Sequence, residues 1–206
     1  DDRDYYMPTT VVYDVSEPIH FNTVDIYDPG ALVGGGVPLS LRLDPGYTLS
    51  AESVYVQNRA ELALHGGTLN AGNVQINGLL PLDESIITTG HILQTAGRSS
   101  ISGELFVGNG SYDLVGGVLG AQDEVIMDIG KFVQFGGTNN VGHRLSIYGT
   151  YTQNGGDTLS GPILFVDGAY ILNGGGLTAT ENEVVGYFNP GIFSQTGGTN
   201  VVTGNL

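Results

Sequence analysis

Residues 132–158 read FVQFGGTNNVGHRLSIYGTYTQNGGDT, and one pattern occurs twice within them. An aromatic residue, a spacer and a glutamine precede a Gly-Gly pair that begins at Gly136 and again at Gly155. The same pair recurs along the rest of the chain, in most places at nearly the same interval. A recurrence of about 20 residues with strand-like flanks predicts a solenoid in which each repeat forms one coil.

The paired glycines are expected to mark one corner of the coil. A tight turn between strands needs a positive φ, which glycine reaches without steric cost. A degenerate copy, Ala96-Gly97, lies within the longest gap between full pairs. Replacing Gly137 or Gly156 with valine should cost about 1–3 kcal/mol through backbone strain. The corner glycines are Gly66, Gly67, Gly116, Gly117, Gly136, Gly137, Gly155, Gly156, Gly174, Gly175, Gly197 and Gly198.

Each repeat contains three short stretches with strand-like alternation. Residues i and i+2 of a strand share a face, so the aromatic residue before the corner and its i+2 partner should point inward. A second strand follows the glycines. The third strand is expected to point pairs such as Leu145 and Ile147, or Val125 and Met127, inward. The sequence therefore predicts an all-β fold, a parallel three-sided β-solenoid (β-helix) with about ten coils of about 19–20 residues each.

The inward residue before each corner is either leucine or glutamine, and its type correlates with the residue five positions later. Leucine is followed by leucine, as in Leu114 and Leu119, whereas glutamine is followed by a polar residue. A buried glutamine without a hydrogen-bond partner would cost about 1–3 kcal/mol. We therefore expect contact across the corner within each polar pair. These pairs are Gln94 with Ser99, Gln134 with Asn139, Gln153 with Thr158, and Gln195 with Asn200.

The Gly-Gly motif is absent from the start of the chain, so we divide the chain into an N-terminal strand-rich segment (1–40) and solenoid repeats (41–206). The segment is expected to form atypical coils or an assembly or capping element. Asp-Pro-Gly turns begin at Asp28 and at Asp44, closer together than successive Gly-Gly pairs, which favours shorter coils in this region.

The end of the sequence falls in the first inward site of a third strand, without a polar capping coil. An open solenoid end presents unpaired strand edges and bare core. Either more chain has been removed or another copy covers this end. The hypothesis is head-to-tail stacking of copies by strand addition, with the N-terminal strands as the partner of the C-terminal coil. The assembly ends would comprise Val11, Val12, Tyr13, Val15, Val201, Val202 and Leu206.

Composition constrains the partners. The formal net charge is −15, from 21 acidic and 6 basic residues, which disfavours nucleic acids and anionic membranes. No apolar run reaches the length of roughly 18 residues that is typical of a membrane span. The chain has no cysteine and starts at Asp1, which we interpret as a mature N-terminus left by a removed signal peptide.

Two phrases carry a resemblance to a known class of proteins. Residues 193–200 (FSQTGGTN) and 170–179 (YILNGGGLTA) resemble repeats of large bacterial surface proteins, the autotransporter-passenger-like β-solenoids. The resemblance covers roughly residues 60–206. It implies an adhesive or structural role at the bacterial cell surface rather than catalysis.

The sequence contains no clear catalytic pattern. A polysaccharide lyase would need carboxylates for Ca²⁺ and a basic residue on one face. No His-Glu-x-x-His motif occurs, and no Gly-x-Ser-x-Gly elbow. The basic residues and the histidines instead occupy scattered repeat phases, at Arg3, Arg42, Arg59, Arg98, Lys131, Arg144, His20, His65, His91 and His143.

No cofactor is expected. Calcium remains an alternative, because acidic residues close in sequence could supply hard oxygen ligands, although the nonapeptide calcium repeat is absent. The candidates are Glu181 with Glu183, Asp123 with Glu124, and Asp1, Asp2 and Asp4. A solvated acidic surface is the favoured interpretation.

The sequence thus favours a structural, non-enzymatic extracellular protein that assembles head to tail into a filament or surface layer. An adhesin or glycan-binding passenger fragment is the alternative, and a polysaccharide lyase comes third.

Overall fold

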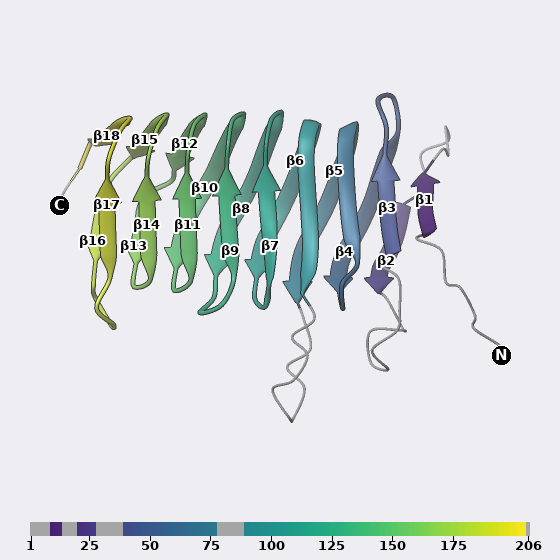
Figure 1. Cartoon of the computed structure of the whole chain (residues 1–206), viewed down its shortest axis with the longest axis horizontal. Helices are drawn as coiled ribbons and strands as arrows, with labels where there is room; N and C mark the ends of the chain where they lie inside the picture. The colour runs from purple at the N-terminus through teal and green to yellow at the C-terminus, as the bar shows by residue number, and fades with distance from the viewer. Residues whose placement is uncertain (1–8, 14–19, 28–38, 78–88, 205–206) are drawn as a thin grey trace, which may run out of the picture.

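The computed structural model describes residues 9–13, 20–27, 39–77 and 89–204, and within them the regular elements are all strands. Figure 1 shows them stacked as the rungs of a rod, with β1 near one end and β18 at the other. The strands are β1 (Thr9–Tyr13), β2 (His20–Tyr27), β3 (Leu39–Leu43), β4 (Thr48–Gln57), β5 (Glu61–Asn77), β6 (Gly90–Val107), β7 (Gly110–Leu114), β8 (Val118–Ile126), β9 (Lys131–Gln134), β10 (Thr138–Ile147), β11 (Thr150–Gln153), β12 (Asp157–Ser160), β13 (Ile163–Val166), β14 (Ala169–Leu172), β15 (Gly176–Ala179), β16 (Asn182–Val185), β17 (Ile192–Gln195) and β18 (Thr199–Val202).

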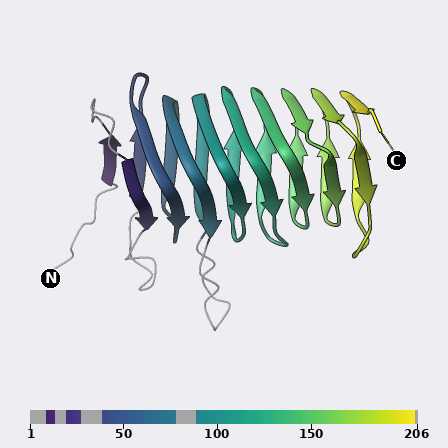
Figure 2. The ribbon, with the colours of Figure 1, turned by 180° about the vertical axis from the view of Figure 1, so that it is seen from behind.

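Each coil has three faces, as the repeat predicts. In one coil the first face holds β9, the second face holds residues 138–141 of β10, and the third face holds residues 144–147 of β10. Each of these segments pairs in parallel with its equivalent in the next coil, so that Phe132 lies beside Tyr151 and Leu145 beside Leu164. Seen from behind, the longer strands bend around the edge between the second and third faces (Figure 2). A parallel three-sided β-solenoid is therefore confirmed.

The described strands of the N-terminal segment (1–40) join the same ladders. β1 pairs in parallel with β3, and β2 pairs in parallel with β4. The ladder aligns Thr9 with Leu39, a longer step than that between successive Gly-Gly corners, so the expected shorter coils are wrong. A second long step runs from Glu61 to His91. These long steps use up chain, and the solenoid has about eight turns instead of the expected ten.

The core is one cluster of inward side chains from the three faces, and it runs along the axis. Fully buried aromatic rings from the first face stack along the axis, with centroid separations of 5.2 Å for Tyr112–Phe132, 4.6 Å for Phe132–Tyr151 and 4.7 Å for Tyr151–Tyr170. Phe193 continues the column at 5.3 Å from Tyr170. The inward direction of these aromatic residues is confirmed.

The expected inward pair Val125 and Met127 is wrong. The ladder aligns Leu105 with Glu124 and Val107 with Ile126, so Glu124 takes the inward position and is fully buried. The sequence pattern failed here because a carboxylate occupies a site that holds leucine in neighbouring coils.

The paired glycines lie at the corner between the first and second faces. The second glycine of most pairs has a positive φ, for example 72° at Gly137 and 73° at Gly156. The first glycine of the pair is required for a different reason. A Cβ at Gly136 would lie 2.7 Å from the carbonyl oxygen of Val115 in the preceding coil. One glycine thus makes the turn and the other lets consecutive corners stack closely.

Candidate functional surfaces

Buried glutamines cap the Gly-Gly corners from inside. The amide nitrogen of Gln153 donates to the carbonyl of Gly156 at 3.0 Å and to that of Gly176 in the next coil at 2.9 Å. Gln134 makes the same two bonds, to Gly137 at 3.3 Å and to Asp157 at 3.1 Å. Each glutamine therefore holds its own corner and fastens it to the following coil.

The predicted direct contact within the polar pairs holds in one coil. Ser99 donates to the side-chain oxygen of Gln94 at 2.9 Å. In the next such coil, Gln134 and Asn139 are both buried but are joined through the hydroxyl of Tyr151, at 3.0 Å and 3.2 Å.

The other two polar pairs bond elsewhere. Thr158 donates to Gln134 of the preceding coil at 2.6 Å rather than to Gln153. Asn200 donates to Glu183 at 2.9 Å, while Gln195 donates to the carbonyl of Gly198 at 3.1 Å. The partners therefore lie mainly in adjacent coils, because stacking brings those side chains closer than the corner does.

A concave feature of the described surface runs along the axis, at the edge between the second and third faces. It has a volume of about 1000 Å³ and is lined by residues from β2 to the segment after β15. Its floor places Asn70 beside Ser100, and Gly120 beside Asn140, in register. We call this feature the axial groove.

The axial groove is lined mainly by amides, hydroxyls and small residues. Gln122 and Asn140 supply amides, and Arg98, whose Nε donates to the hydroxyl of Ser100 at 3.0 Å, supplies a cation. Such a surface can hydrogen-bond an extended polar polymer lying along the rod.

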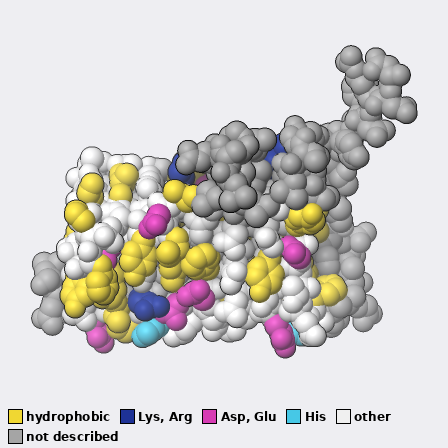
Figure 3. All heavy atoms as spheres, turned by 90° about the horizontal axis from the view of Figure 1, so that it is seen from below, with side chains coloured by type: hydrophobic (Ala, Val, Ile, Leu, Met, Phe, Trp, Pro, Cys, Tyr) yellow, Lys and Arg dark blue, Asp and Glu magenta, His cyan; other side chains and the backbone are white. Residues whose placement is uncertain are grey.

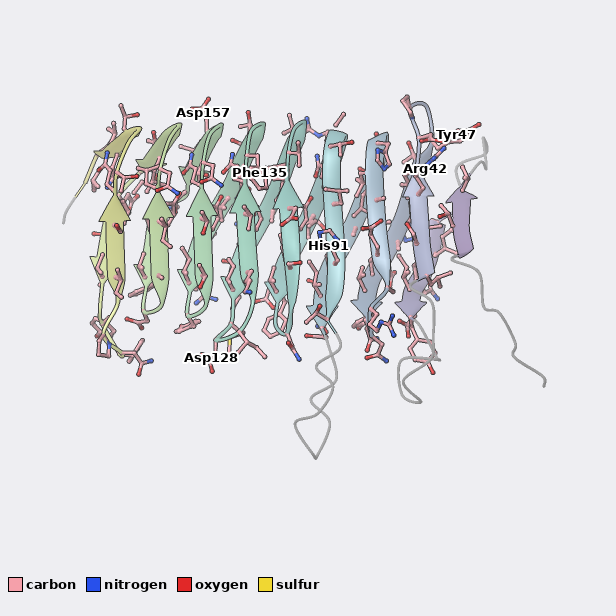
Figure 4. The ribbon with its side chains drawn as sticks, viewed as in Figure 1. Arg42, Tyr47, His91, Asp128, Phe135 and Asp157 are labelled. Atoms are coloured by element: carbon pink, nitrogen blue, oxygen red, sulfur yellow. The ribbon has the colours of Figure 1, made fainter. Side chains whose placement is uncertain are left out.

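A charged cluster crosses three coils on the outside of the first face. His91 lies between Glu61 and Asp113, with ring nitrogens 3.1 Å and 3.3 Å from the two carboxylates, and Ser40 donates to Glu61 at 3.1 Å. Figure 4 places His91 midway along this face. The hydrogen bond to Asp113 and the charges of both acids raise the pKa of His91, against the opposing effect of burial. The protonated ring can therefore bind two neighbouring coils together.

The candidate calcium-binding residues and the nearby basic residues do not converge on one site. Asp123 pairs with His143 at 2.9 Å and lies 4.0 Å from Arg144, while Glu124 points into the core and Glu181 is exposed. Among the described residues, no group of three or more His, Cys, Asp or Glu side chains could hold a metal ion. The candidates Asp1, Asp2 and Asp4 lie outside the described residues.

The expected assembly ends lie at opposite ends of the rod. Val12 is exposed on β1, and Val201 is exposed on β18, while Val202 packs against the end of the core. The backbones of Val11 and Tyr13 belong to β1. Val15 and Leu206 lie outside the described residues.

Exposed hydrophobic side chains also gather on the underside of the rod (Figure 3). Tyr187 and Phe188 project from the loop between β16 and β17, with 65% and 71% of their surfaces exposed. Asp167 holds this loop by accepting from the backbone of Tyr187 at 2.6 Å and of Phe188 at 3.2 Å.

Sequence reasoning missed the tyrosine that completes the sites of Gln94, Gln134 and Gln153. The hydroxyls of Tyr112 and Tyr170 donate to Gln94 and Gln153 of the preceding coil, both at 2.5 Å. Where the preceding corner carries Leu114 instead, the ring is Phe132. Tyrosine thus follows glutamine, whereas phenylalanine or isoleucine follows leucine, as Ile92 does after Leu64. This pattern is present in the sequence.

No protein-family model, curated protein or solved structure shows a significant match to this chain. The described part of the chain contains no helix of the length and apolar character needed to cross a membrane.

Proposed function

We propose that the protein is a structural, non-enzymatic component of a bacterial cell surface, and that its copies stack end to end into a filament or layer. The observation that carries this proposal is the pair of end rungs. Within the described residues, β1 pairs on one side with β3, and β18 pairs on one side with β15. Each leaves one row of backbone groups directed along the axis, where a parallel strand of a second copy would continue the ladder.

The last described coil presents a partly uncovered end of the core. Phe193 ends the aromatic column with one ring face covered by Tyr170, and Val202 is only partly buried at the end of the core. A further coil would bury both. The net charge of −15 favours solubility, which suits an extracellular protein.

The test places one lysine at the end and one on the side. Val201→Lys puts a charge on the β18 edge, and Val115→Lys is the control, since Val115 is similarly exposed (43% against 48%) but lies mid-rod. Sedimentation velocity at rising concentration should show assembly of the wild type and of V115K, and loss of assembly in V201K. A wild-type chain that stays monomeric throughout contradicts the proposal.

The axial groove favours a second candidate, binding of a glycan chain. Its length along several coils and its lining of Asn70, Ser100, Gln122 and Asn140 suit the hydroxyls of an extended neutral saccharide. The register of the floor aligns the polar side chains of Asn70 and Ser100, and places Asn140 in the same file after Gly120.

Gly120 allows this candidate to be tested without disturbing the coil. A Cβ at Gly120 would meet its nearest atom, the carbonyl oxygen of Asn140, only at 3.9 Å, so a side chain can be added to the groove floor. If glycans bind there, Gly120→Tyr should abolish binding on a glycan array, and Thr152→Tyr on the first face should not. Equal binding by both variants would exclude the groove.

A further inference from the structure

Two glutamates point into the solenoid at one equivalent rung. The ladder of the third face aligns Glu124, Leu145, Leu164 and Glu183 in successive coils. Glu124 is fully buried, and Glu183 is only 6% exposed. Within the described part of the chain, no ion pair joins either carboxylate to Lys, Arg or His. A buried carboxylate without a cation is costly, so these two side chains require a specific partner.

Asparagine in the following coil is that partner. The amide nitrogen of Asn139 donates to Glu124 at 3.0 Å, and that of Asn200 donates to Glu183 at 2.9 Å. Asn139 and Asn200 occupy equivalent inward sites on the second face, separated by Thr158 and Leu177.

Comparison of all the coils shows that the two residue types occur together. Asparagine stands at the second-face site only when the preceding coil carries glutamate at the third-face site. The remaining described pairs of third-face residue and following second-face residue contain neither, and they are Val24–Leu49, Val54–Leu69, Val74–Ser99, Leu105–Leu119, Leu145–Thr158 and Leu164–Leu177. Glutamate and asparagine therefore occur as one unit that spans two coils.

The hydrogen bonds of the first unit are incomplete if Glu124 is a carboxylate. Oε1 of Glu124 and Oδ1 of Asn139 are both buried without a partner. Both atoms are acceptors, so the ionised acid leaves two lone-pair groups unpaired in the core. A proton on Oε1 changes this, because a neutral acid and a primary amide each offer one donor and one acceptor.

We propose that Glu124 and Asn139 form a proton-binding site, in which the neutral acid donates to the amide oxygen while the amide donates back to the acid. Loss of that proton removes one of the two bonds and leaves a negative charge in the core. The rod is then less stable at alkaline pH than at mildly acidic pH. Glu183 and Asn200 repeat the same residue pairing at the C-terminal end, where the amide of Asn200 donates to Glu183 and Oδ1 of Asn200 is also buried without a partner.

The surroundings of Glu124 favour the neutral form. Burial raises the pKa of Glu124 to about 7, with the hydrogen bond from Asn139 acting in the opposite direction. The titratable groups that interact with this carboxyl across the core are Tyr112, Tyr151 and Tyr170, whose own pKa values are raised by burial. They stay neutral in the same range. The neighbours of Glu124 on its own face are Leu105 and Leu145.

The sign of the pH effect follows from these values. An acid whose pKa rises from 4.5 to about 7 on folding binds more protons in the folded state, so stability falls as pH rises between the two values. Over that interval of about 2.5 units, the folding equilibrium constant should fall by up to about 300-fold.

Glu124→Gln is the decisive variant, since a glutamine reproduces the neutral acid with one donor and one acceptor. Urea unfolding between pH 4.5 and pH 8.5 should show that the wild type loses stability with rising pH and that E124Q loses much less. Glu52→Gln, at an exposed site, is the matched control and should follow the wild type. The proposal is overturned if E124Q retains the full wild-type dependence.

Two further measurements keep the proposal testable if E124Q folds poorly. In wild-type protein, ¹³C NMR should show the Glu124 carboxyl titrating near neutral pH, and titration in the usual carboxyl range would contradict the proposal. Glu124→Leu alone should destabilise at every pH, whereas E124L combined with Asn139→Leu should recover stability, as in the Leu164–Leu177 coil. If a chelator destabilises the wild type but not E124Q, the pair binds a cation, and the proposed proton-binding site is overturned.

Discussion

At the scale of the residue, the corners of the solenoid require glycine, because a side chain there would strain the backbone and collide with the preceding coil. Gly137 lies at a corner and has a φ of 72°, and a Cβ there would lie 2.6 Å from the carbonyl oxygen of Gly117. Gly120, on the second face, has free space and no such φ. Gly137→Val should therefore lower the free energy of unfolding by about 1–3 kcal/mol, whereas Gly120→Val should change it little, as urea denaturation would measure. Equal losses at both positions would mean that general glycine loss, and not corner strain, sets the effect.

Buried polar side chains also affect stability residue by residue. Each one stabilises the fold only when its hydrogen-bonding groups are paired. Gln153→Leu removes the partner of the Tyr170 hydroxyl and of two corner carbonyls, so it should cost about 1–3 kcal/mol. Adding Tyr170→Phe removes the unpaired hydroxyl and recreates the Leu114–Phe132 arrangement found elsewhere in the chain. A double-mutant cycle by thermal denaturation should show recovery. Additive losses would contradict the view that the two residues form one unit.

At the scale of the element, neighbouring strands are joined by side chains as well as by backbone. His91 on β6 lies between Glu61 on β5 and Asp113 on β7, and the two acids raise its pKa. A histidine whose pKa rises on folding contributes stability below its unfolded value of 6.5, and loses it as pH rises through the raised value. His91→Gln should therefore weaken the dependence of the melting temperature on pH between pH 6 and pH 8.5. His20→Gln, at an exposed site, should leave that dependence unchanged. If the melting temperature of H91Q depends on pH as steeply as that of the wild type, His91 is not the titrating group.

The strands themselves could be predicted because each has a clear period of two and a glycine corner beside it. Phe132 and Gln134 on β9 face inward as expected, and the third strand of that coil, with Leu145 and Ile147, does too. The third strand of the preceding coil was misaligned by one residue. Hydrophobic alternation favours Val125 and Met127, and the inward Glu124 becomes reasonable only once Asn139 of the next coil lies beside it. Contacts between coils decide such sites, and the sequence of one coil does not contain them.

At the scale of the whole molecule, the repeat predicts one axis, three faces and parallel stacking, and the structure has all of these. The axial groove could not be predicted, since it results from how the second and third faces meet. The same holds for the site of His91, whose partners Glu61 and Asp113 come from the two neighbouring coils. His91 and Glu124 together predict a rod most stable in mildly acidic solution, because both lose their contribution as pH rises.

End-to-end stacking is the central claim at this scale, and cryo-electron microscopy of the wild-type chain at high concentration tests it most directly. The account predicts filaments in which the strand spacing of about 4.8 Å continues without a break from one copy to the next. Single rods of about eight turns with no regular end-to-end junction would contradict it.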